Sequence, residues 1–215
     1  MEKTLFVTEI FKSLQGEGSR SGLPTVFIRL SGCPLRCTWC DTIYSFTKGE
    51  KMSIAEILQK VESFEIKEIC VTGGEPLAQK NVFFLLKILC DKGLSVSLET
   101  SGALSIKNVD PRVANILDFK APDSGESEKN HWENLKFLKK ERDEIKIIIA
   151  SRTDFEWAVS EIENRQILPI VPIIFSAAAP LLEPQTLADW ILSIKKPIRL
   201  QLQLHKILWN DARGK

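Results

Sequence analysis

Three cysteines lie close together in the segment 31–42, whose sequence is Ser-Gly-Cys-Pro-Leu-Arg-Cys-Thr-Trp-Cys-Asp-Thr. Cys33, Cys37 and Cys40 fall within eight residues, and the glycine and proline beside them indicate a loop. Thiolates select zinc, Cu(I) or iron–sulfur clusters, and a structural zinc site takes four protein ligands. No fourth Cys or His stands nearby in the sequence. The three thiolates therefore favour a cluster with one iron left open for a small-molecule ligand.

A glycine-rich acidic segment, Thr72-Gly73-Gly74-Glu75-Pro76, follows a predicted strand at 67–72. Two successive glycines let backbone carbonyl groups approach a ligand ammonium, and a carboxylate adds negative charge beside it. On its own the segment is equally compatible with a turn. At the end of the next strand after the cysteine loop, it instead indicates a ligand site.

Strands and helices are predicted to alternate along the chain. The predicted strands are 4–12, 24–30, 67–72, 94–99, 115–120, 144–149, 168–174 and 197–203. The predicted helices are one that begins at Ser53 with a capping box, 81–92, the charged stretch 136–142, 153–164 and 184–194. This alternation predicts βα units and a parallel sheet. About six units are visible, fewer than the eight that close a barrel, so we expect an α/β fold: an open, partial α/β barrel of about six parallel strands, in a single domain spanning residues 1–215.

The predicted parallel strands end in small and polar residues. The cysteine loop follows one strand, and the others are followed by segments 72–76, 99–102 (Glu-Thr-Ser-Gly) and 120–124 (Lys-Ala-Pro-Asp-Ser). Because ligands gather beyond the carboxyl ends of parallel strands, these segments and the cysteines are expected on one rim.

Composition excludes several other classes of protein. The chain has 215 residues, of which 44% are hydrophobic and 27% charged, and its formal net charge is +1. These values are typical of one globular domain with no polyanionic partner, so we expect neither nucleic-acid nor membrane binding. The charged N-terminus lacks the apolar core of a signal peptide, and clustered cysteines fit a reducing compartment, which together predict a cytoplasmic protein. Cys70 and Cys90 lie in apolar runs and are predicted to be buried small hydrophobic residues.

The C-x3-C-x2-C spacing of the cysteines resembles that of the radical S-adenosylmethionine (SAM) enzymes. The resemblance implies that Cys33, Cys37 and Cys40 hold a 4Fe-4S cluster whose fourth iron is chelated by SAM, which then yields a 5'-deoxyadenosyl radical. Segment 72–76 is similar to the Gly-Gly-Glu element that receives the amino group of SAM in those enzymes.

A finer resemblance, to the 7-carboxy-7-deazaguanine synthase family, covers most of the chain. It is carried by segments 11–18, 33–42, 72–76, 99–102 and 203–206, together with Arg29 and Lys120. The resemblance implies conversion of 6-carboxy-5,6,7,8-tetrahydropterin to 7-carboxy-7-deazaguanine with loss of ammonia, on the route to queuosine and related 7-deazapurines. SAM would be regenerated in each cycle.

The same resemblance assigns roles to individual residues. Substrate binding is expected from Leu14, Gln15, Gly16, Arg29 and Thr72. SAM binding is expected from Trp39, Asp41, Gly73, Gly74, Glu75, Asp118 and Lys120. Thr42 is expected to ligate Mg²⁺. Further candidates are Glu17, Glu99, Thr100, Ser101, Gln203 and His205, although a lone histidine beside a strand, like His205, is more often a structural residue. An external reductant such as flavodoxin or ferredoxin, and assembly as a homodimer, complete the expected partners.

Three alternatives stay open at this point. A glycyl-radical-enzyme activating enzyme shares the cluster spacing and the Gly-Gly-Glu element, although segment 13–18 and Asp41-Thr42 argue against it. A non-catalytic iron–sulfur electron-transfer or scaffold protein would need neither an open iron nor Gly-Gly-Glu. A zinc-binding interaction module is the third.

Overall fold

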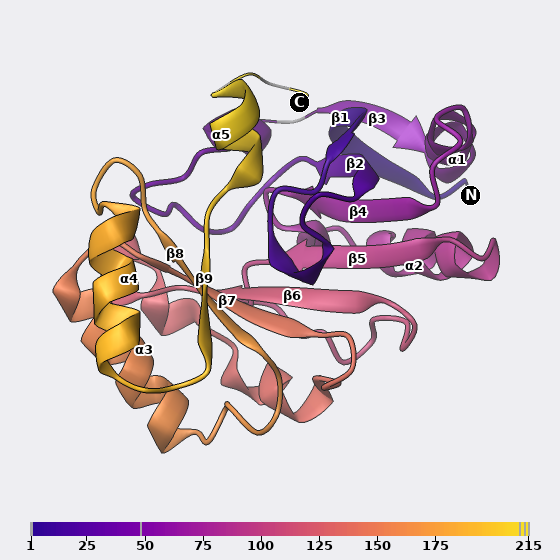
Figure 1. The fold of residues 1–215 in the computed structure, drawn as a ribbon. Coiled ribbons are helices and arrows are strands. Elements are labelled where there is room, and N and C mark those ends of the chain that lie inside the picture. The colour runs from indigo at the N-terminus through magenta and orange to yellow at the C-terminus, as the bar shows by residue number, and fades with distance from the viewer. Residues whose placement is uncertain (1, 48, 211, 213, 215) are drawn as a thin grey trace.

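The fold is built on one nine-stranded sheet with the strand order β3-β1-β2-β4-β5-β6-β7-β8-β9 (Figure 1). The computed structural model describes residues 2–47, 49–210, 212 and 214, and only the backbone of His205. The strands are β1 (Thr4–Leu14), β2 (Pro24–Leu30), β3 (Glu50–Ser53), β4 (Glu68–Gly73), β5 (Ser95–Thr100), β6 (Ala114–Phe119), β7 (Glu144–Ile149), β8 (Ile173–Ala177) and β9 (Ile198–Gln201).

Parallel pairing runs without interruption from β2 through β4 to β9, whereas β1 pairs antiparallel with both β2 and β3. In the strand order, β3 and β9 are the two edges and do not pair with each other. The predicted open α/β barrel is therefore confirmed, with one more parallel strand than expected. All parallel strands end on the same side, which brings the loops after them to one rim.

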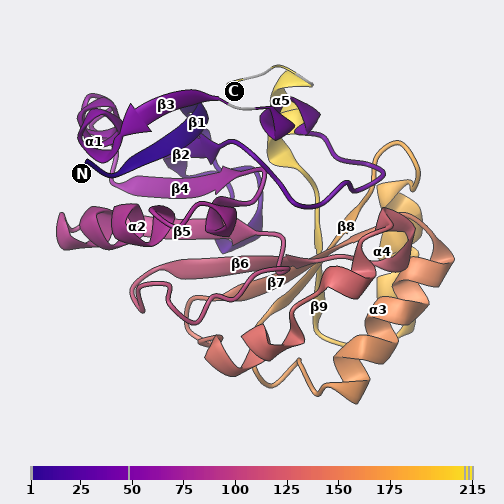
Figure 2. The same cartoon turned by 180° about the vertical axis from the view of Figure 1, so that it is seen from behind.

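Among the described residues, five α-helices accompany the sheet: α1 (Ile54–Glu62), α2 (Val82–Asp91), α3 (Arg152–Asn164), α4 (Pro184–Ser193) and α5 (Leu204–Trp209). The predicted capping box begins α1, where the Glu56 amide donates to Ser53 Oγ at 3.2 Å and the Ser53 amide donates to Glu56 Oε2 at 2.7 Å. Both views place α5 apart from the other helices and next to the segment that follows the cysteine loop (Figures 1 and 2). None of the described helices combines the length and the apolar character needed to cross a membrane.

Alternation along the strands separates the core from the interior of the barrel. In β7, Ile145, Ile147 and Ile149 are buried in the hydrophobic core, whereas Lys146 and Ile148 line a cavity on the other face. The same period of two places Val26, Ile28 and Leu30 of β2 in the core and leaves Phe27 and Arg29 on the cavity side. The polar residues at alternate positions of these strands are therefore the ones available for a site.

Two predicted elements differ from the structure. The strand expected at 168–174 is instead β8, beginning at Ile173, because Pro169 and Pro172 lack the amide hydrogen that a parallel ladder requires. The charged stretch 136–142 is not an α-helix: a 3-10 helix ends at Phe137, and the turn that follows is stabilised by buried Asp143, which accepts from the Lys139 amide at 2.8 Å. Cys70 and Cys90 are buried, as predicted.

Candidate active site

A cavity of about 760 Å³ opens at the carboxyl ends of the parallel strands. Every site residue predicted from the sequence lines it except Glu75 and His205, and the His205 side chain lies outside the described part of the structure. The cavity residues from the prediction are Leu14, Gln15, Gly16, Glu17, Arg29, Cys33, Cys37, Trp39, Cys40, Asp41, Thr42, Thr72, Gly73, Gly74, Glu99, Thr100, Ser101, Asp118, Lys120 and Gln203. Residues separated by up to 189 positions in the sequence thus meet in one hollow.

The cysteine loop leaves β2 and is braced by the segment after β6. The Arg36 amide donates to Glu126 Oε1 at 2.5 Å, and the Thr38 amide donates to the Ser124 carbonyl at 3.1 Å. All three thiols are partly buried and face the cavity. The loop is therefore held from outside, with its sulfur atoms turned inward.

Burial affects the chemistry of these thiols. It raises the pKa of Cys33 and, more strongly, that of Cys37, to about 11, although the nearby Lys120 ammonium partly opposes the shift. Among the residues that the structure describes, no three His, Cys, Asp or Glu side chains converge as ligands of a single metal ion. A cubane cluster has no such requirement, because each of its cysteines binds a different iron. Three soft donors on one loop beside an open cavity fit a 4Fe-4S cluster with one corner free.

The two glycines after β4 allow a close backbone approach. A Cβ atom on Gly73, whose φ is +144°, would lie 2.1 Å from the Leu30 carbonyl oxygen, and one on Gly74 would lie 2.3 Å from the Gly32 carbonyl oxygen. The glycines therefore let the end of β4 pack against the start of the cysteine loop, and both also line the cavity.

Glu75 occupies a different position from the one expected of a SAM ligand. Its side chain is fully buried and does not line the cavity. The carboxylate accepts hydrogen bonds from Thr100 Oγ1 at 2.9 Å, from the Ser101 amide at 2.8 Å and from the Leu77 amide at 2.9 Å. In this structure Glu75 therefore fixes the end of β5, including two residues that do face the cavity, and its contact with SAM stays a prediction.

Glu99 forms the centre of a polar floor in the cavity. Its carboxylate accepts from Gln15 Nε2 at 3.2 Å and from Thr72 Oγ1 at 3.0 Å. These three residues come from the β1–β2 loop, β4 and β5. They present an alternation of donors and acceptors suited to a flat heterocycle that carries both.

Arg29 lies on the β2 side of the cavity with two partners that sequence analysis did not identify. Its Nε is 2.7 Å from Glu9 Oε1, and the same oxygen accepts from the Tyr44 hydroxyl at 2.9 Å. Burial opposes the charge of Arg29, but Tyr44 and Glu9 outweigh that effect and raise its pKa. The guanidinium is therefore held charged at the cavity wall. Glu9 and Arg29 are cross-strand partners in the β1–β2 register, a pairing that no local motif in the sequence indicates.

A chain of charges crosses the other side of the cavity. Lys120 Nζ is 3.1 Å from Asp118 Oδ1, while Lys146 Nζ is 3.4 Å from Asp118 Oδ2 and 2.6 Å from Glu17 Oε2. Lys146 was also missed by sequence analysis, because a lysine inside an apolar strand resembles a solvated position until the direction of its side chain is known.

Thr42 and Asp41 lie at the mouth of the cavity. The Thr42 hydroxyl is 3.6 Å from Cys40 Sγ, and Asp41 is largely exposed, with Lys206 Nζ at 4.0 Å from its Oδ2. Lys206 belongs to α5, whose first residue donates its amide to the Gly16 carbonyl at 3.1 Å. The C-terminal segment therefore contacts both the β1–β2 loop and the cysteine loop.

Comparisons with known proteins agree with this geometry. Residues 27–118 match the radical SAM superfamily. The 7-carboxy-7-deazaguanine synthase of Chlorobaculum tepidum is 48% identical over 99% of this chain and 98% of its own length. The enzymes of the same name from Koribacter versatilis and Thermoplasma acidophilum are 39% and 34% identical, over 97% and 98% of this chain and 99% and 100% of their own lengths.

Solved structures show the same fold at lower identity. The crystal structure of QueE from Escherichia coli superposes with a TM-score of 0.76 at 23% identity, covering 94% of this chain and 95% of that one. SuiB from Streptococcus suis, bound to its precursor peptide SuiA, has a TM-score of 0.58 at 13% identity and covers 82% of this chain and 48% of that one. Full-length similarity at up to 48% identity, on a radical SAM fold, establishes that the chain belongs to the 7-carboxy-7-deazaguanine synthase family of the radical SAM superfamily.

Proposed function

We propose that this protein converts 6-carboxy-5,6,7,8-tetrahydropterin to 7-carboxy-7-deazaguanine with loss of ammonia, as a single radical SAM core domain. The observation that carries the proposal is one cavity in which three inward-facing thiols share the space with Arg29 and the Gln15–Glu99–Thr72 floor. The full-length relatives carry the name of this activity. A peptide-directed activase would have less use for a small polar floor of this kind.

Superfamily membership implies a 4Fe-4S cluster and SAM, and the cavity has residues for both. Cys33, Cys37 and Cys40 would hold the cluster. Trp39, Asp41, Gly73, Gly74, Asp118 and Lys120 would contact SAM. When bound and reduced, the pair supplies a 5'-deoxyadenosyl radical that takes a hydrogen atom from the substrate. The loop brace at Glu126 and Ser124 keeps the thiols in place for that role.

The substrate has a carboxylate and a heterocycle with both donors and acceptors, and the cavity offers a partner for each. Arg29, held in place by Glu9, which also accepts from the Tyr44 hydroxyl, would pair with the carboxylate. Gln15 and Glu99 would meet the polar edge of the ring, and Thr72 would hold Glu99 in position. Partial burial of this floor strengthens each of these interactions.

We infer that Thr42 supplies one oxygen ligand to Mg²⁺. It lines the cavity beside the cysteine loop, where a bound substrate and water would complete an octahedron. The measurement is activity against Mg²⁺ concentration: Thr42→Ala should raise the Mg²⁺ requirement at least about tenfold, and an unchanged requirement would remove Thr42 from the site.

The remaining expectations concern partners and setting. A flavodoxin or ferredoxin would deliver the electron, in the reducing cytoplasm that five free cysteines suit. Support for a homodimer comes from the edge strand β9, from α5 and from the link between them, where Leu200, Leu202, Ile207 and Leu208 are exposed. Analytical ultracentrifugation of the wild type and of Leu202→Lys would test that contact.

The deciding experiment is anaerobic reconstitution of the cluster, followed by incubation with SAM, Mg²⁺, reductant and the carboxytetrahydropterin. The expected result is 7-carboxy-7-deazaguanine, with SAM used catalytically. Stoichiometric release of 5'-deoxyadenosine without product would favour a glycyl-radical-enzyme activating enzyme. A reduced cluster whose spectrum does not respond to SAM would favour an electron-transfer protein.

A further inference from the structure

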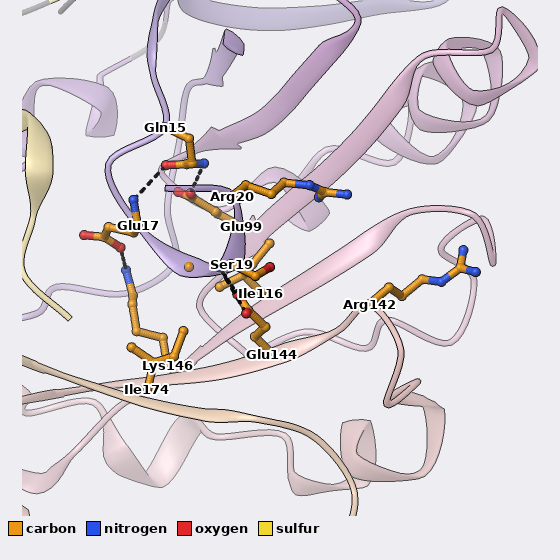
Figure 3. A pocket seen from close by; sticks show the side chains of 11 residues that line it. Gln15, Glu17, Ser19, Arg20, Glu99, Ile116, Arg142, Glu144, Lys146 and Ile174 are labelled. Atoms are coloured by element: carbon orange, nitrogen blue, oxygen red, sulfur yellow. Dashed lines mark hydrogen bonds and ion pairs between the residues drawn. The ribbon is translucent and has the colours of Figure 1, made fainter. Parts of the chain in front are cut away.

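Lys146 lies in the cavity between the β1–β2 loop and the carboxyl end of β6. Its Nζ is 2.6 Å from Glu17 Oε2 on one side and 3.4 Å from Asp118 Oδ2 on the other. The side chain is only 11% exposed. Figure 3 shows it rising from β7 to meet Glu17 in the loop above.

The two carboxylates that Lys146 contacts belong to different parts of the site. Glu17 sits in the β1–β2 loop next to Gln15, and its other oxygen accepts from Gln203 Nε2 at 2.7 Å. Asp118 is the penultimate residue of β6 and pairs with Lys120, which is close enough to Cys37 to influence its pKa. One ammonium group therefore connects the loop assigned to the substrate with the strand end assigned to SAM.

The neighbours of Lys146 favour its protonated, positively charged form. Burial opposes it, but the carboxylates of Glu17, Asp118 and Glu99 outweigh burial and hold the lysine pKa well above its usual value. A buried ammonium between carboxylates also fixes their orientation, because each oxygen that it contacts is held in a directional charge-assisted hydrogen bond or close ion pair.

We propose that Lys146 is a positioning residue that orients Glu17 and Asp118 together and so couples the substrate side of the cavity to the SAM side. The inference rests on the proposed function for the identity of the two ligands. It assigns a role to a residue that no sequence motif identified, and it predicts that one substitution in β7 disturbs the binding of both molecules.

Glu144 provides a matched comparison on the same strand and face, two residues earlier. Both of its carboxylate oxygens accept from the Ser19 amide at 3.1 Å (Figure 3). A Cβ atom on Gly18, whose φ is +72°, would lie 2.6 Å from Glu144 Oε2, so the loop backbone rests directly on this carboxylate. Glu144 thus holds the substrate loop but does not reach Asp118, which makes it a probe of the substrate side alone.

The test measures two quantities in the reconstituted enzyme: the KM for the pterin, and the dissociation constant of SAM from its effect on the spectrum of the reduced cluster without turnover. Lys146→Met should raise both, each by about tenfold or more. Lys146→Arg, which keeps the charge, should recover most of the loss.

Glu144→Gln should raise the pterin KM and leave the SAM dissociation constant within about twofold. Lys136→Met, at an exposed ion pair with Glu133, should change neither.

A second variant separates positioning from folding. Lys146→Met leaves Glu17 and Asp118 without their shared cation, so its melting temperature is expected to fall. Lys146→Met combined with Glu17→Gln removes one carboxylate and should restore melting while SAM and pterin binding stay weak. Normal binding of both ligands in the single variant, or recovery of both in the double variant, would overturn the proposal. A wild-type enzyme that binds SAM but makes no product would instead defeat the proposed function, and the SAM arm would still test Lys146.

Discussion

Glu99 is the residue on which the polar floor depends, because Gln15 and Thr72 both donate to it. In Glu99→Gln the shape of the side chain is kept, but the negative charge is lost and one of the two acceptor oxygens becomes an NH2 donor, so Gln15 and Thr72 can no longer both donate at their present positions. We expect kcat/KM for the pterin to fall about 10- to 100-fold, since a partly buried group loses its partner. SAM binding should be unchanged, because no SAM-side residue contacts this carboxylate directly.

Steady-state kinetics alongside SAM binding would check this prediction. Glu133→Gln is the matched control, since Glu133 is exposed and pairs with Lys136 on the surface. Equal kinetics for Glu99→Gln and wild type would show that the floor does not contact the substrate.

Cys37 has a raised pKa whose effect can be measured in the cluster-free protein. Burial raises its pKa to about 11 and Lys120 lowers it, so at pH 8 the thiol of the cluster-free protein is about 0.1% thiolate. Alkylation of Cys37 in that form should accelerate about tenfold per pH unit from 8 to 10 without reaching a plateau. Lys120→Met removes a nearby positive charge and should slow the reaction further. Mass spectrometry of the alkylated peptide gives the rates, and a plateau below pH 9 would contradict the prediction.

Some site residues can be recognised from local sequence, whereas others reach the cavity only through the pairing of strands. The cysteine spacing and the Gly-Gly-Glu element could be recognised in the sequence because each is local. Glu9 and Lys146 could not, because they reach the site only through the β1–β2 register and the inward face of β7. The position of Glu75 was also not predictable, since it depends on where β5 ends relative to β4.

At the junction between β4 and the cysteine loop, the two backbone segments pack closely against each other. Gly74→Ala would place a Cβ atom 2.3 Å from the Gly32 carbonyl oxygen, so the backbone must move. We expect a loss of about 2–4 kcal/mol in the free energy of unfolding and a lower iron content after reconstitution. The displaced element would be the loop that carries Cys33.

Gly93→Ala is a suitable control for backbone strain without steric conflict, because the φ of Gly93 is +74° and no atom lies within 4 Å of a Cβ placed there. It should cost about 1 kcal/mol and leave iron content unchanged. Chemical denaturation and iron analysis of both variants distinguish a local loop effect from general destabilisation. Equal iron content in the two variants would show that the junction does not shape the cluster loop.

At the level of the whole molecule, the alternating pattern was enough to predict an open α/β barrel with its polar loops on one rim. The pattern did not predict how the open barrel is completed. That depends on long-range contacts: Gly18 donates its amide to Gln201 Oε1 at 2.7 Å, and Leu204 donates to Gly16 at 3.1 Å, so the first loop is tied to the last strand and helix. Such contacts join positions about 180 residues apart and leave no local periodicity to recognise.

The C-terminal segment is therefore expected to affect substrate binding more than the stability of the sheet. Removal of residues 202–215 leaves β9 and its pairing with β8 in place but deletes the Gln203–Glu17 hydrogen bond and the Lys206–Asp41 contact. We expect the melting temperature to fall by only a few degrees, because none of the residues described in the deleted segment belongs to the hydrophobic core. The pterin KM should rise about tenfold or more, since the loop that carries Gln15 and Glu17 loses the hydrogen bonds from Gln203 to Glu17 and from Leu204 to Gly16. Gln203→Ala should reproduce part of this increase without any truncation. A truncated protein with wild-type KM would show that the segment merely lies over the cavity, whereas a collapse of melting would show that the open edge of the sheet needs it for folding.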